Sequence, residues 1–149
     1  VIKHNPNGKQ IKLFYDQWKH ERLVVDKWFS TQVLTAHPNS LNKVVKNLTN
    51  HSDFNIITPN RVRSVLGAFS ANTAGFHLET GENYKLFCDW ILKVDPVNPQ
   101  VGARMCSAFE TWKRYDPKRK KLIESQINRV LGTASVSKDT TEMLTRLIN

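Results

Sequence analysis

The segment His20-Glu21-Arg22-Leu23-Val24 is the part of this sequence that comes nearest to a zinc-peptidase signature. A His-Glu-x-x-His helix binds zinc because its two imidazoles lie one helical turn apart, and its Glu then serves as a general base. Here position 24 is Val, which cannot ligate a metal. We therefore interpret this segment as structural. The other histidines share no i, i+4 spacing; they are His4, His37, His51 and His77.

Signatures of other catalytic chemistries are also missing from the sequence. It contains no Gly-x-Ser-x-Gly elbow and no Gly-rich phosphate loop, and its six glycines are scattered. Cys88 and Cys106 lie 18 residues apart without any Cys-x-x-Cys spacing, so we predict that both are reduced thiols in the core. The sequence thus predicts no catalysis by this chain alone.

The strongest basic cluster surrounds Asp116-Pro117, in a chain of net charge +9. Such a charge suits an anionic partner, which could be nucleic acid, a membrane surface, an acidic domain or a carboxylate ligand. Charge runs alone are weak signals, so we interpret the cluster as a solvated helix face, with a nucleic-acid patch as the alternative. The cluster consists of Lys113, Arg114, Lys118, Arg119, Lys120 and Lys121.

Four tryptophans could stack on nucleic-acid bases, as they do in proteins that bind single strands. Each of them, however, falls among apolar residues at helical spacing. We therefore predict that all four pack in the core. They are Trp18, Trp28, Trp90 and Trp112.

Prolines and capping residues recur at near-constant spacing and mark the starts of helices. Proline suits the first helical position because its missing N–H would stay unpaired there, and a preceding Thr, Asn or Asp can cap the free amides. The starts lie 18 to 22 residues apart. They are His37-Pro38, Thr58-Pro59, Thr80, Asn98-Pro99, Asp116-Pro117 and Ser137.

Between these starts the apolar residues recur at i, i+3, i+4 and i+7, which is the pattern of amphipathic helices. A helix with its loop takes about 20 residues and a pair about 40, the period of HEAT and armadillo arrays. The sequence therefore predicts an all-α fold, a HEAT/armadillo-like helical-repeat superhelix of about eight antiparallel helices. The stripes are Ile11, Phe14, Tyr15, Trp18; Leu41, Val44, Val45, Leu48; Val62, Val65, Leu66, Phe69; Phe87, Trp90, Ile91, Val94; Val101, Met105, Ala108, Phe109, Trp112; and Ile123, Ile127, Val130, Leu131.

Beyond periodicity, particular strings follow one another in a fixed order. They are Asp26-Lys27-Trp28-Phe29, Thr58-Pro59-Asn60-Arg61-Val62-Arg63-Ser64, Gly67-Ala68-Phe69, Phe76-His77, Gly81 with Tyr84, Asn98-Pro99-Gln100-Val101, Ala103-Arg104, and Lys113-Arg114-Tyr115-Asp116 followed by Lys118-Arg119. In type, order and separation these strings resemble the C-terminal domain of bacterial aminopeptidase N, a family of gluzincin zinc metallopeptidases. The resemblance runs from about residue 9 to the end of the chain.

The resemblance implies that residues 1–149 form a single α-helical domain, the last one of a larger aminopeptidase N, with residues 1–8 as a connecting segment. In that family the intact enzyme removes single residues from peptide N-termini, and the zinc and its Glu base lie in an earlier domain. It therefore implies no cofactor in this chain, zinc in the missing catalytic domain and no activity for this part alone. The implied partners are the upstream domains of the same polypeptide and peptide substrates, with no membrane span and no nucleic acid. The implied location is cytoplasmic.

The resemblance also assigns candidate site residues. Arg63 and Arg104 resemble arginines that face the substrate chamber, and Gln100 is a further candidate beside them. In the family this domain closes the chamber and lines its leaving-group side. A guanidinium can hold a peptide carboxylate or carbonyl through paired hydrogen bonds, which orients the substrate. The alternative is a free-standing helical-repeat module that binds protein or nucleic acid.

Overall fold

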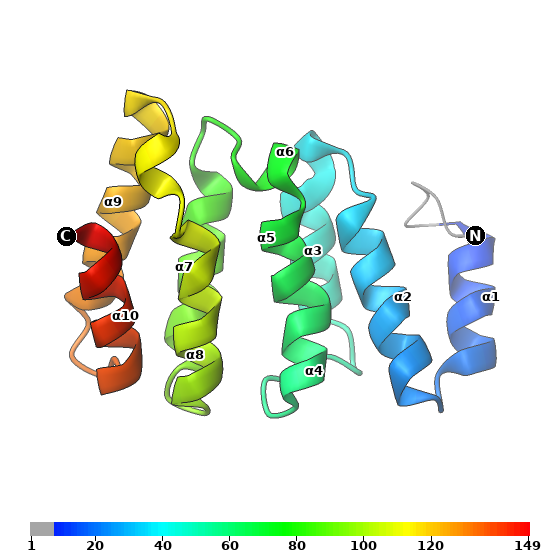
Figure 1. Ribbon diagram of the computed structural model, residues 1–149. Helices are drawn as coiled ribbons and strands as arrows, with labels where there is room; N and C mark the ends of the chain where they lie inside the picture. Colours follow the sequence, from blue (N-terminus) through cyan, green and yellow to red (C-terminus); the bar gives the residue numbers. More distant parts are fainter. Residues whose placement is uncertain (1–7) are drawn as a thin grey trace. The chain divides into compact units, whose positions relative to one another are not determined.

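The computed structural model describes residues 8–149, so residues 1–7 of the expected connecting segment lie outside the described part. The chain divides into two compact units, Val1–Phe76 and His77–Asn149. Every regular element in the described part is helical, and within each unit successive helices run in alternating directions (Figure 1). None of these helices is long and apolar enough to cross a membrane.

The first unit is built from helices of at most 13 residues, one of which contains a π-helical turn. The helix over residues 59–71 is continuous, but its middle turn, η2, is a π-helix. It packs against α2, and α2 also contacts α1 and α3. The elements are α1 (Lys9–Trp18), α2 (Arg22–Leu34), η1 (Pro38–Ser40), α3 (Leu41–Thr49), α4 (Pro59–Val62), η2 (Arg63–Gly67), α5 (Ala68–Ala71) and α6 (Thr73–Phe76).

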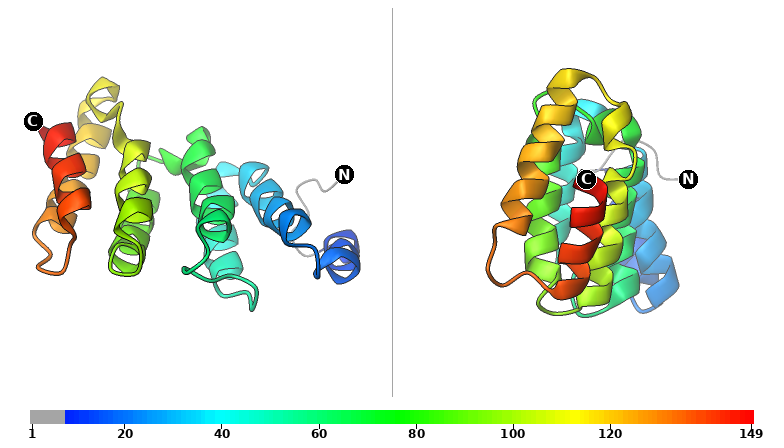
Figure 2. Two further views of the ribbon diagram at one scale, coloured as in Figure 1. Left: turned by 60° about the horizontal axis from the view of Figure 1, so that its bottom comes forward. Right: turned by 60° about the vertical axis from the view of Figure 1, so that its left-hand side comes forward.

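The second unit pairs α7 with α9 and α8 with α10, which lie side by side in Figures 1 and 2. Counting residues 59–71 as one helix, the described residues of the two units form eight α-helices besides the four-residue α6. The all-α helical-repeat prediction is therefore confirmed. The elements are α7 (Glu82–Val94), α8 (Pro99–Met105), η3 (Cys106–Phe109), η4 (Trp112–Arg114), α9 (Pro117–Leu131) and α10 (Lys138–Ile148).

Most of the predicted helix starts hold, because the capping chemistry is local. Asn98, Asp116 and Ser137 each accept a hydrogen bond from a backbone N–H in the first turn of α8, α9 and α10. The start predicted at Thr80 is displaced, since α7 begins at Glu82. There Gly81 takes a left-handed conformation with φ 75°, which residues other than glycine rarely adopt.

The predicted apolar stripes form most of the core, with a correction after α8. Leu41, Val45, Val65, Ile91 and Ile127 are among many stripe residues with no exposed surface. The stripe predicted through Met105 to Trp112 is not one helix, because α8 ends at Met105 and the chain continues through the 3₁₀ turns η3 and η4.

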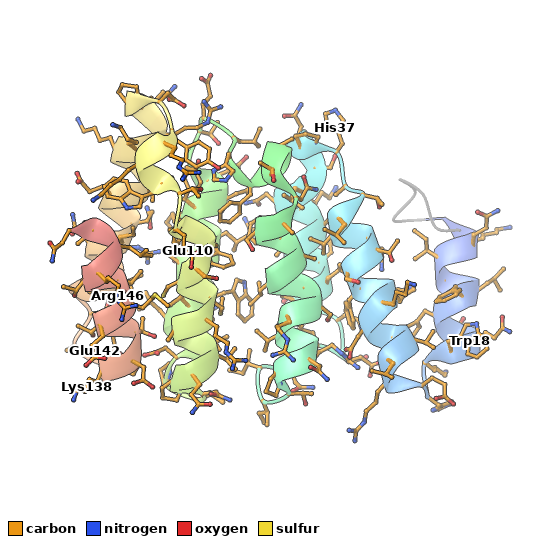
Figure 3. All side chains as sticks on the ribbon, viewed as in Figure 1. Trp18, His37, Glu110, Lys138, Glu142 and Arg146 are labelled. Atoms are coloured by element: carbon orange, nitrogen blue, oxygen red, sulfur yellow. The ribbon has the colours of Figure 1, made fainter. Side chains whose placement is uncertain are left out.

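The prediction that every tryptophan packs in the core was wrong for Trp18. Its side chain is 39% exposed at the C-terminal end of α1 (Figure 3), where it contacts the ring of Phe14. Trp28 and Trp112 are buried as predicted, while Trp90 is half-buried and carries the ammonium of Lys93 over its ring. An apolar stripe indicates which face of a helix is apolar, but not whether another element covers that face.

A buried carboxylate ties α10 to the end of α7. Asp95 is 1% exposed and accepts hydrogen bonds from Ser137 N at 2.6 Å, Ser137 Oγ at 2.6 Å and Thr140 Oγ1 at 2.6 Å. Gly102 of α8 approaches the same carboxylate so closely that an added Cβ would lie 2.7 Å from Asp95 Oδ1. One side chain thereby holds the start of α10 against α7 and α8.

Candidate functional site

Arg63, the first candidate, lies in the first unit at the beginning of the π-turn η2. Its side chain is exposed, and its Nη2 donates a hydrogen bond to Asn60 Oδ1 one turn earlier. A guanidinium has five N–H donors, and among residues 8–149 this one is hydrogen-bonded to a single partner, in its own helix. The candidate therefore keeps most of its donors available to a ligand.

Arg61, two residues earlier, has a different role. Its guanidinium, 11% exposed, pairs with Asp26 Oδ1 at 2.5 Å, donates to the carbonyl oxygen of Asp53 and lies 5.2 Å from the Phe29 ring centroid. A planar guanidinium suits this combination of ion pair, hydrogen bond and ring contact. Arg61 and Asp26 belong to two of the strings that carry the resemblance, and their pairing gives both strings a structural reason.

Gln100 and Arg104, the other two candidates, lie on α8 in the second unit. They are spaced i, i+4, which places both side chains on the same face of the helix. Both are exposed, whereas Val101 and Gly102 between them are buried. The structure thus brings Gln100 and Arg104 together on one exposed face, while Arg63 belongs to the other unit.

A second set of strings converges on His77. The His77 Nδ1 lies 2.7 Å from Tyr84 Oη, and the His77 Nε2 lies 2.9 Å from Tyr115 Oη. The Tyr115 ring also stacks on the imidazole, with centroids 4.2 Å apart. Arg119 Nε donates to the His77 carbonyl at 2.6 Å, and Arg119 Nη1 pairs with Asp116 Oδ1 at 2.8 Å. Segments up to 42 residues apart in sequence meet here.

The surroundings of this imidazole favour its neutral form. Burial, and then the positive charge of Arg119, lower the pKa of His77 below its ordinary value of 6.5. Burial likewise raises the pKa of Tyr84 above its usual range. The imidazole and the Tyr84 phenol are therefore uncharged near neutral pH. This cluster is suited to holding α7 against α9, and not to general acid–base chemistry.

Basic residues line a cleft at the beginning of α9, beside η4. Its walls are Trp112, Lys113, Pro117, Lys120, Lys121 and Glu124. Among these residues Trp112 is held in place, because it is 6% exposed and its indole Nε1 donates to the Leu147 carbonyl at 2.8 Å. Three of the six residues of the predicted basic cluster thus line one hollow instead of being spread over a convex face.

Metal ligands do not gather anywhere in the described residues. No group of three or more His, Cys, Asp or Glu side chains in residues 8–149 could hold a metal ion. His20 is exposed and Val24 is only partly buried, so the segment nearest to a zinc signature does not form a site. The residues present here do not fit the zinc that the resemblance implies for the intact enzyme.

The two cysteines behave as predicted. Cys88 and Cys106 are free, and they are buried to within 1% of full burial. Burial raises the pKa of the Cys106 thiol to about 12 and that of Cys88 still higher above its ordinary value. Both thiols therefore remain protonated and packed in the core.

Comparison with known protein families agrees with the all-helical fold described above. Residues 2–149 match a family model described as "Domain of unknown function (DUF3458_C) ARM repeats". The chain belongs to this ARM-repeat family. The match covers nearly all of the sequence, so both units of this DUF3458_C chain fall within it.

Relatives of this DUF3458_C chain include aminopeptidases. It is 35% identical over 144 residues to aminopeptidase N of Caulobacter vibrioides, covering 96% of this chain and 17% of that protein. It is 34% identical to aminopeptidase N of Escherichia coli, covering 89% of this chain and 15% of the relative. In these proteins the matched region is the C-terminal part. The chain therefore spans about a sixth of the length of these relatives.

A solved structure shares the fold as well. The crystal structure of Legionella pneumophila aminopeptidase A in complex with aspartic acid matches 93% of this DUF3458_C chain and 16% of its own, with 33% identity and a TM-score of 0.86. The recognition of an aminopeptidase N-type C-terminal domain from the sequence is thus confirmed. The roles of Arg63, Gln100 and Arg104 remain predictions.

Two polar networks of the structure were not predicted from the sequence. Neither the Asp95 network nor the His77 cluster follows from local patterns, because each joins segments about 40 residues apart. For the His77 cluster a signal was nevertheless present, since His77, Tyr84, Tyr115 and Arg119 all lie in strings that carry the resemblance. These strings mark the packing between helices as well as any site.

Proposed function

We propose that this chain is the C-terminal accessory domain of an aminopeptidase, an enzyme that removes single residues from peptide N-termini. The observation that carries this proposal is the match of almost the whole chain, at about one third identity, to the C-terminal part of aminopeptidase N. Both compact units belong to this one domain, with residues 1–8 connecting it to the rest of the polypeptide. Its partners are the upstream domains and the peptide substrates, and the enzyme is cytoplasmic.

The chemistry of peptide hydrolysis belongs to the upstream part of the enzyme. We assign zinc and its ligands to that part, as the resemblance to aminopeptidase N implies, and the His, Cys, Asp and Glu residues described here do not group into a metal site. This domain is inactive by itself and contributes to binding. It closes the substrate chamber and lines the side where the leaving peptide lies.

Arg63, Arg104 and Gln100 are the side chains that contact the leaving peptide. Each is exposed, and each carries N–H donors that a carbonyl or carboxylate oxygen can accept. The i, i+4 pair on α8 offers a guanidinium and an amide about one turn apart, a spacing close to that of every second carbonyl group along one side of an extended peptide. Such contacts orient the substrate and do not take part in bond cleavage.

Steady-state kinetics of the intact enzyme test this role. Arg63→Ala and Arg104→Ala should raise KM or lower kcat for peptides of three or more residues by at least about tenfold, since lost hydrogen bonds to a charged group cost roughly 1.5–3 kcal/mol. Hydrolysis of single-residue chromogenic amides, which have no leaving peptide, should change little. Arg114→Ala, another exposed arginine, is the matched control. An equal effect on both substrate types would refute the placement.

The alternative function is a helical-repeat module that binds nucleic acid through its basic cluster. It predicts tight binding of oligonucleotides by the chain alone, with an affinity that falls steeply with salt. Our proposal predicts weak binding at physiological salt, which a fluorescence anisotropy titration at two salt concentrations would distinguish.

A further inference from the structure

We infer that the cleft at the beginning of α9 is a binding site for small phosphate compounds that also carry a hydroxyl donor. The inference rests on the basic cleft of the second unit and is independent of the proposed aminopeptidase role. Its walls are Trp112, Lys113, Pro117, Lys120, Lys121 and Glu124.

Positive charges without ion pairs are the first observation. Within residues 8–149, none of Lys113, Lys120 and Lys121 forms an ion pair, although their neighbours do. Lys118 pairs with Glu79 at 3.9 Å, and Arg119 pairs with Asp116 at 2.8 Å. Three ammonium groups lining one hollow repel each other, and a dianion between them removes that repulsion. Lysine is a common phosphate ligand for this reason.

The fixed positions of Trp112 and of the first turn of α9 are the second observation. Trp112 is held by its hydrogen bond to the Leu147 carbonyl, and the Lys113 ammonium lies 5.8 Å from the centroid of its ring. Asp116 caps α9 by accepting from Arg119 N at 3.1 Å, which fixes the turn from which Lys120 and Lys121 extend. A ligand therefore meets lysines mounted on ordered backbone.

The carboxylate in the wall determines the class of anion. Glu124 lines the same cleft and has no ion pair among the described residues. Next to an extended polyanion it would be repulsive, which disfavours a nucleic-acid strand. A hydrogen phosphate ion avoids this repulsion, because it is a dianion that keeps one O–H group, from which the Glu124 carboxylate can accept a hydrogen bond. Sulfate has the same charge and shape but no donor at neutral pH.

NMR titration of the 149-residue chain tests the inference. At pH 7.5 and constant ionic strength, inorganic phosphate should shift the Trp112 indole N–H and the amides of residues 113–124 in a saturable manner. Sulfate should bind at least about fivefold more weakly. Glycerol 3-phosphate forms a separate arm, because tighter binding than that of phosphate would identify a phosphate ester, and weaker binding the free ion, as the preferred ligand.

Variants assign the binding to this cleft. Lys120→Gln with Lys121→Gln should weaken phosphate binding by about tenfold. Lys43→Gln with Lys46→Gln, which removes two exposed lysines of α3, should leave it unchanged. Glu124→Gln should reduce the preference for phosphate over sulfate. None of these side chains is buried in the core, and the unchanged amide spectrum of each variant verifies its fold.

Three results would overturn the inference. One is a phosphate shift that does not saturate or is spread over all lysines. Another is an equal loss of phosphate affinity in the variant that lacks Lys120 and Lys121 and in the variant that lacks Lys43 and Lys46. The third is a single-stranded oligonucleotide that binds the cleft much more tightly than phosphate, with several counterions released, since this would make the cleft a nucleic-acid site.

Discussion

Asp95→Ala should destabilise the second unit more than the substitution of any other carboxylate residue of α7 by Ala. The carboxylate is 1% exposed and accepts three hydrogen bonds, all at 2.6 Å. Hydrogen bonds to charged groups are worth roughly 1.5–3 kcal/mol each. Removing the carboxylate also removes its desolvation cost of several kcal/mol. We therefore expect a net loss of about 3 kcal/mol in the free energy of unfolding.

Urea unfolding followed by the NMR signals of residues 77–149 measures this loss. With a slope of about 1.5 kcal/mol/M for a unit of this size, the midpoint should fall by about 2 M. The amides of α10 should also lose hydrogen-exchange protection, because Ser137 and Thr140 at its start lose their acceptor.

Asp89→Ala is the matched control on the same helix. Its carboxylate is 30% exposed and pairs with Arg129 at 2.7 Å and Lys85 at 3.3 Å. Pairs of this kind near the surface contribute at most about 1 kcal/mol, so the midpoint should move by less than about 0.7 M. Equal midpoints for the two variants, or unchanged exchange at α10 in Asp95→Ala, would refute the anchoring role of Asp95.

Other predictions concern two glycines, one histidine and one thiol. Gly102→Ala should lower the free energy of unfolding by about 1–3 kcal/mol, because the added Cβ would lie 2.9 Å from Asp95 Cα. Gly67→Ala, whose added Cβ has its nearest contact at 3.8 Å, should raise the free energy of unfolding by about 0.5–1 kcal/mol. Urea midpoints that move in the same direction in both variants would contradict this. The pKa of His77 is lowered in the folded state, so below pH 6.5 the unfolded state binds more protons and stability should fall with pH until the folded pKa is passed. The difference in the free energy of unfolding between pH 7.5 and pH 5.5 should be smaller in His77→Phe than in the unsubstituted protein. An identical difference in the two proteins would exclude His77 as the cause. Since burial raises the pKa of Cys106 to about 12, native protein should not react with iodoacetamide at pH 8 and unfolded protein should, as mass spectrometry would show.

How far the fold could be predicted depends on how local its causes are. Asn98, Asp116 and Ser137 cap the helices that they precede, so composition and spacing were sufficient to place α8, α9 and α10. The start of α7 was displaced because Gly81 sets it by a left-handed backbone conformation. That conformation is a property of the folded turn, and a single glycine in the sequence does not predict it.

The features that escaped prediction depend on contacts between distant segments. Ser137 and Thr140 reach Asp95 across 42 and 45 residues, and Arg119 reaches the His77 carbonyl across 42. No periodicity relates such positions. The candidate site residues also could not be found from local patterns, because Arg63, Gln100 and Arg104 were identified from the resemblance to a known family. Their exposure agrees with a binding role but does not specify a ligand.

Restoration of activity in trans tests the central claim most directly. The upstream part of the parent aminopeptidase, expressed without residues 1–149, would be assayed for hydrolysis of a tripeptide before and after addition of this chain. The account predicts that the upstream part alone is impaired and that adding the chain raises kcat/KM for the tripeptide in a saturable manner. Identical kinetics with and without the chain would contradict the account.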